Sequence, residues 1–95
     1  MIGIVKQEGG NVVIYDENGA FKCPCGGYGD LKGFSSSIVV RQDGSNLVIY
    51  DENGSFRCNC GGSGDFYAVV GDTVVRKEGS TLTVYDSNGN FLRNN

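Results

Sequence analysis

The chain has 95 residues, of which 39% are hydrophobic and 20% charged, and it contains no histidine and no tryptophan. A chain of this length folds as one domain with a small core. Without histidine it holds neither a Ser-His-Asp triad nor a histidine-ligated metal. The formal net charge of −3 argues against nucleic-acid binding, since few cations are available to neutralise phosphates.

A 35-residue repeat is the main feature of the sequence. Residues 3–37 and 38–72 are identical at 18 of 35 aligned positions, and residues 73–95 form a third, shorter copy. Such a period predicts a repeat architecture within one domain, in which neighbouring units bury each other's apolar faces.

Each copy is expected to form β-strands. In the first copy the last segment, 31–37, is polar and rich in serine, so its strand is the weakest. The second copy predicts strands at 38–42, 46–50, 55–60 and 65–70. A three-residue loop, 43–45, joins the first two strands, and Asn53-Gly54 marks the next turn. The third copy stops two thirds of the way through, which gives about eleven strands in all.

The fold class is therefore all-β, with three antiparallel hairpin repeats and pseudo-threefold symmetry. A β-prism, a β-trefoil and a short β-solenoid all fit the pattern. The strand count stops one short of twelve. Either the symmetry is broken where the copies meet, or another chain supplies the missing strand by edge addition.

One face of the hairpin in the second copy is a candidate binding surface. Pairing across a three-residue loop would place Gln42 opposite Asn46 and Val40 opposite Val48, on the same face as Tyr50. Leu47 and Ile49 would then form the core face, and the face with the two amides and the phenol would be partly solvated.

The spacing on this face resembles the sugar-binding motif of the bulb-type mannose-binding lectins of monocots, Gln-x-Asp-x-Asn-x-Val-x-Tyr. The matching residues are Gln7, Asn11, Val13 and Tyr15 in the first copy and Gln42, Asn46, Val48 and Tyr50 in the second. The resemblance implies a β-prism and carbohydrate binding by these residues. The Asp of the motif is replaced by Gly9 and Gly44, and the family's core tryptophan is absent.

Four cysteines occur as two equivalent Cys-x-Cys pairs, Cys23 with Cys25 and Cys58 with Cys60. In a strand the two cysteines of each pair point the same way as the preceding phenylalanine, Phe21 or Phe56, and this side is expected to face inward. Disulfides between the copies, one four-cysteine zinc site and free buried thiols are all open alternatives. The third copy has Arg93 and Asn95 at the cysteine positions and joins none of them.

Charges recur at two further positions. Lys6, Arg41 and Arg76 are basic in every copy, and Glu8, Asp43 and Glu78 are acidic. On a threefold body these would form two solvated rings of opposite sign, which could orient identical subunits that stack end to end.

No nucleophile with a base, acid pair or cofactor loop indicates an enzyme. We expect a non-enzymatic structural or assembly protein, such as a virion accessory, tail or decoration component or the subunit of an extracellular filament. Its expected partners are itself or other structural proteins. The alternative is a lectin-like carbohydrate-binding module. No membrane span or signal peptide is evident. The sequence leaves the localisation open, and the assembly function would place the protein in a virion or outside the cell.

Overall fold

The computed structural model describes residues 1–94, which form eleven strands and three antiparallel sheets. The first sheet contains β1 (Ile2–Glu8), β2 (Asn11–Asp16) and β3 (Phe21–Cys25). The second contains β4 (Asp30–Phe34), β5 (Ile38–Asp43), β6 (Asn46–Asp51) and β7 (Phe56–Cys60). The third contains β8 (Asp65–Val70), β9 (Thr73–Glu78), β10 (Thr81–Tyr85) and β11 (Phe91–Asn94). The expected all-β class with three antiparallel repeats is confirmed.

The sheets do not coincide with the repeats of the sequence. The fourth strand of the first repeat, β4, pairs with β5 of the second repeat, and β8 pairs in the same way with β9. Each repeat thus contributes its last strand to the sheet that follows. The first sheet has three strands, and β1 lies at its edge. The equivalent strands of the other two sheets, β5 and β9, each have a neighbouring strand on both sides.

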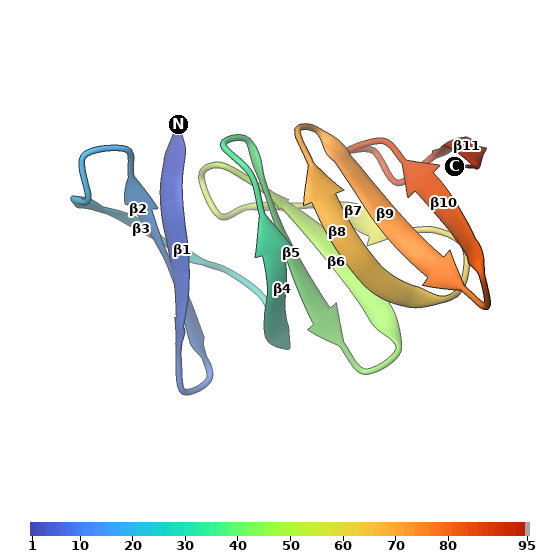
Figure 1. The fold of residues 1–95 in the computed structure, drawn as a ribbon. Coiled ribbons are helices and arrows are strands. Elements are labelled where there is room, and N and C mark those ends of the chain that lie inside the picture. Colours follow the sequence, from blue (N-terminus) through green and yellow to red (C-terminus); the bar gives the residue numbers. More distant parts are fainter. Residues whose placement is uncertain (95) are drawn as a thin grey trace.

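The three sheets lie in an open row (Figure 1), with overall extents of 38 × 24 × 19 Å. Apolar side chains form two separate clusters, one between the first and second sheets and one between the second and third. A closed prism would enclose one core shared by three sheets. Of the three arrangements that the sequence leaves open, the row is closest to the short solenoid, and it does not close into a barrel.

The middle sheet is buried on both faces. Val39, Val48 and Tyr50 pack against the first sheet, whereas Val40 and Ile49 belong to the cluster that packs against the third. Two-sided burial explains why β5 and β6 contain nearly continuous apolar runs rather than strict alternation.

The hairpin of the middle sheet has a different register from the one expected. Asp43 pairs with Asn46, so the loop has two residues, and Gln42 therefore lies opposite Leu47. Gly44, with φ of +62°, takes the first loop position, as glycine does in a type II′ turn. The shift by one residue places Gln42 and Asn46 on opposite faces of the sheet.

A bulge in β3 and another in β7 correct the expected direction of the phenylalanines. Cys58 pairs with Ile49 and Phe56 with Tyr50, so Arg57 is the extra residue on its strand. The bulge turns Phe56 away from the face that carries the cysteines. Its ring is 63% exposed and meets Tyr50 edge-on at 6.4 Å between centroids, and the other two copies repeat this arrangement.

Candidate functional site: the joins between sheets

The contact between two neighbouring sheets is here called a join. A buried arginine forms hydrogen bonds across each of the two joins. Arg41 extends from β5 into the loop that follows β3 and donates to the carbonyl oxygens of Cys25, Gly26 and Gly29 at 2.7–3.2 Å. The side chain is 1% exposed, and no described carboxylate forms an ion pair with it. Backbone carbonyls therefore satisfy the guanidinium, and the glycine-rich loop folds around a cation from the next repeat.

Arg76 repeats this contact at the second join. It extends from β9 and donates to the carbonyls of Cys60, Gly61 and Gly64 at 2.6–3.2 Å, and it is 5% exposed. The expectation of a solvated basic ring is therefore wrong for both arginines. Lys6, the equivalent in the first repeat, is exposed and lies over the ring of Tyr15 at 5.5 Å from its centroid.

A tyrosine accompanies each arginine. Tyr50 is buried against the same loop, and its hydroxyl lies where a side chain on Gly27 would be. Tyr85 occupies the same position against Gly62. Burial raises the pKa of Tyr50, and the guanidinium of Arg41 and the backbone of Tyr28 oppose that shift. Glycine is thus required in these loops because the incoming tyrosine occupies the space.

The four cysteines are free thiols and belong to two different clusters. Cys25 and Cys23 lie with the cluster of the first join, and Cys60 and Cys58 lie with that of the second. The inward direction expected for the cysteines is correct. The structure does not bring the two pairs together, and residues 1–94 contain no group of three or more His, Cys, Asp or Glu side chains placed to share a metal ion. In the third copy Arg93 pairs with Val84 as Cys58 pairs with Ile49, and Asn95 lies outside the described residues.

The buried thiols are held in the neutral form. Burial raises the pKa of Cys25 and of Cys60, although the adjacent Arg41 and Arg76 lower it in part. Burial also raises the pKa of Cys58, whose Sγ donates to the carbonyl of Ser87 at 3.3 Å. A reactive cysteine has a lowered pKa and access to solvent, so these thiols are suited to packing.

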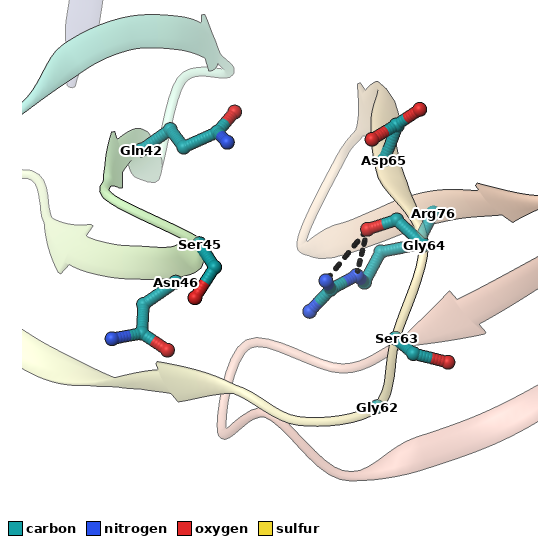
Figure 2. A pocket seen from close by; sticks show the side chains of 8 residues that line it. All are labelled: Gln42, Ser45, Asn46, Gly62, Ser63, Gly64, Asp65 and Arg76. Atoms are coloured by element: carbon teal, nitrogen blue, oxygen red, sulfur yellow. Dashed lines mark hydrogen bonds between the residues drawn. The ribbon is translucent and has the colours of Figure 1, made fainter.

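A pocket of about 430 Å³ opens between the second and third sheets. Its lining comes from the β5–β6 turn on one side and the start of the third sheet on the other: Gln42, Ser45, Asn46, Gly62, Ser63, Gly64, Asp65 and Arg76. Figure 2 shows the guanidinium of Arg76 extending between these two sides toward Ser45, while Gly64 accepts its hydrogen bonds. The pocket is polar and open to solvent.

The structure divides the sugar-motif residues of the second copy. Gln42 and Asn46 line the pocket, but Val48 and Tyr50 are buried at the first join, at 7% and 4% exposure. The expectation that all four share one partly solvated face is therefore wrong. The register places Gln42 on the opposite face from the other three, and the first sheet covers the face that carries Val48 and Tyr50.

The first copy places its motif residues in a different environment. Gln7 bonds across the first join, donating from Nε2 to Asp30 at 3.1 Å and accepting from the amide of Leu31 at 2.9 Å. Asn11 is exposed, and Val13 and Tyr15 are half-buried on the outer face of the first sheet. Gln7 and Asn11 therefore lie on opposite faces here also.

Sequence reasoning missed Arg41, Arg76 and Asp65 as parts of these joins. One sequence signal could have distinguished the two arginines from Lys6. Each arginine follows a complete Cys-x-Cys-Gly-Gly segment, whereas Lys6 has no such segment before it in the sequence. Asp65 starts the predicted strand 65–70 and follows a glycine-rich stretch that is typical of a turn, so its position alone does not indicate a binding residue.

Neither protein-family models nor curated proteins gave a match to this chain. Among residues 1–94 no helix is long and apolar enough to cross a membrane.

Proposed function

We propose that the protein is a non-enzymatic structural protein that assembles by stacking further β-sheets onto its N-terminal sheet. The outer face of that sheet carries this proposal. Ile4 on β1 is 41% exposed, whereas Val39 and Val74, its equivalents in the next two repeats, are fully buried by a preceding sheet. The first sheet thus presents a joining surface that nothing within residues 1–94 covers.

The edge of the first sheet supports the same proposal. β5 and β9 each receive the fourth strand of the preceding repeat, and β1 has no such neighbour among the described strands. An edge strand presents unpaired N–H and C=O groups, which favour the addition of another strand.

A second copy of the chain is the proposed partner. Val75, Leu82 and Val84 of the third sheet occupy the positions at which the first two sheets pack against a following sheet. Val75 and Val84 are already buried, at 6% and 1% exposure, and Leu82 is half-buried. Val70 beside them is 62% exposed. Contact between these two different end faces is heterologous and builds rings or filaments, as expected of an extracellular filament subunit or a virion component.

Light scattering after size exclusion, over a range of concentrations, tests the assembly function. Wild type is expected to form species larger than one chain, and Ile4→Asp to reduce them by placing a charge on the joining surface. Asn90→Asp adds the same charge to an exposed turn of the third sheet and is expected to behave as wild type. A monomer at every concentration would contradict the proposal.

Carbohydrate binding is a second candidate function. It is favoured by the presence of Gln42 and Asn46, both expected from the sequence as sugar-binding residues, in one polar pocket. A glycan array that includes mannosides tests it. Asn46→Ala should weaken binding, while Asn11→Ala, which is not among the pocket residues, should leave binding unchanged.

A further inference from the structure

The pocket between the second and third sheets combines groups that accept and groups that donate hydrogen bonds. Amides come from Gln42 and Asn46, which border the pocket from opposite faces of the hairpin end, a hydroxyl comes from Ser45, and a carboxylate comes from Asp65 across the join. Gly44 contributes no side chain, and its carbonyl accepts from Gln42 at 3.1 Å. The carboxylate in the pocket is therefore supplied by the next sheet rather than by the hairpin itself.

The equivalent position at the first join is closed by direct contacts. Gln7 bonds both Asp30 and the amide of Leu31 there. At the second join, the hydrogen bonds described for residues 1–94 link Gln42 to Gly44 only, and Asp65 has no side-chain partner among them. The same pair of residue types is thus joined at one interface and separated by an open pocket at the other.

The charges around the pocket favour a neutral ligand. The guanidinium of Arg76 already donates to three backbone carbonyls. Asp65 and Glu78, which accepts a hydrogen bond from the lining residue Ser63, would repel an anion. A sugar hydroxyl both donates and accepts, so neighbouring hydroxyls on one ring match a carboxylate together with amides.

We propose that Asp65 is a ligand-binding residue, which accepts hydrogen bonds from the hydroxyls of a neutral pyranoside held by Gln42 and Asn46. This inference rests on carbohydrate binding as the function of the pocket. Residues 1–94 contain one such site, at the second join, because Gln7 and Asp30 close the first.

An NMR titration with the methyl pyranosides of mannose, glucose and galactose tests the site, with inorganic phosphate titrated separately. At least one pyranoside should shift the amide signals of Ser45, Asn46 and Asp65 with a stoichiometry of one. Asp65→Asn should weaken this binding about tenfold, the loss expected for a charged hydrogen bond. Asp30→Asn, the matched change at the first join, should alter it less than about twofold by the same reasoning.

The outcomes separate this inference from the function on which it rests. If a pyranoside binds and Asp65→Asn binds it as tightly as wild type, the role of Asp65 is overturned while carbohydrate binding stands. If no pyranoside binds, or only phosphate binds in the pocket, both are overturned. The amide spectrum of each variant without ligand verifies that it is folded.

Discussion

The guanidinium of Arg41 and the carbonyl oxygen of Gly29 connect the first two sheets, with Nε and Nη2 at 2.9 and 2.7 Å from the same oxygen. Arg41 belongs to the second repeat and Gly29 to the first. The arginine is buried and the contact itself is partly buried, and it recurs between Arg76 and Gly64. The repeats are thus held together by a cation in a loop of carbonyls as well as by apolar packing.

Replacing Arg41 with methionine is expected to destabilise the protein by about 2–4 kcal/mol, because the buried carbonyl of Cys25 and the partly buried carbonyls of Gly26 and Gly29 lose their donor. The free energy of unfolding in urea, followed by circular dichroism, measures this cost. Lys6→Met changes the equivalent exposed residue and should leave the urea midpoint unchanged. Equal effects of the two substitutions would contradict the role assigned to Arg41.

Gly27→Ala is expected to cost much more stability than Gly19→Ala. Both glycines have φ of +82°, so the backbone strain is the same, about 1 kcal/mol in each case. A methyl group on Gly27 would overlap the hydroxyl of Tyr50, whereas nothing lies within 4 Å of the same group on Gly19. Thermal unfolding of the two variants separates steric overlap from backbone strain. Similar melting temperatures would show that Tyr50 moves aside at little cost, and would contradict the prediction.

Stability is expected to fall at alkaline pH because the folded state holds its thiols neutral. The pKa of Cys25 and that of Cys60 are raised by burial in the folded chain. Below the ordinary thiol pKa of about 8.5 both states are protonated, and the full stability is present. Above it the unfolded chain loses protons first, so stability declines as pH rises toward the raised values.

Urea midpoints measured from pH 7 to 10 with reductant present test this dependence. Cys25→Ala combined with Cys60→Ala should flatten the decline, although it lowers the midpoint at every pH by removing buried atoms. A decline equally steep in the double variant would assign the effect to other groups, and Tyr50 is the first of these because burial also raises its pKa.

The strands were predictable from the sequence because their signals are local. Tyr50 and its equivalents, followed by Asp and Asn-Gly turns, recur every 35 residues, and the runs of β-branched residues between turns have the length of strands. The hairpin register was not predicted, because Asp43-Gly44-Ser45 has the composition of a three-residue loop. Only Gly44 has the positive φ that the turn requires. That one-residue error placed Gln42 and Asn46 on one face, whereas the observed register puts them on opposite faces.

The joins could not be predicted from local sequence, because they depend on which sheets stack and their one signal lies in the preceding repeat. Nothing local distinguishes the buried Arg41 from the exposed Lys6, since both lie two residues before an acidic residue in equivalent strands. The carboxylate of Asp65 reaches the pocket only because β8 pairs with β9 rather than with its own repeat. Contacts between repeats, rather than within them, accordingly define both the core and the pocket.

Hydrogen exchange measured at several protein concentrations tests most directly whether the N-terminal sheet is a joining surface. The account predicts that amides of β1 and β2 exchange more slowly as concentration rises, while those of the buried β5 and β6 stay unchanged. Ile4→Asp should abolish the slowing. Exchange in β1 and β2 that is the same at every concentration would contradict assembly through this sheet.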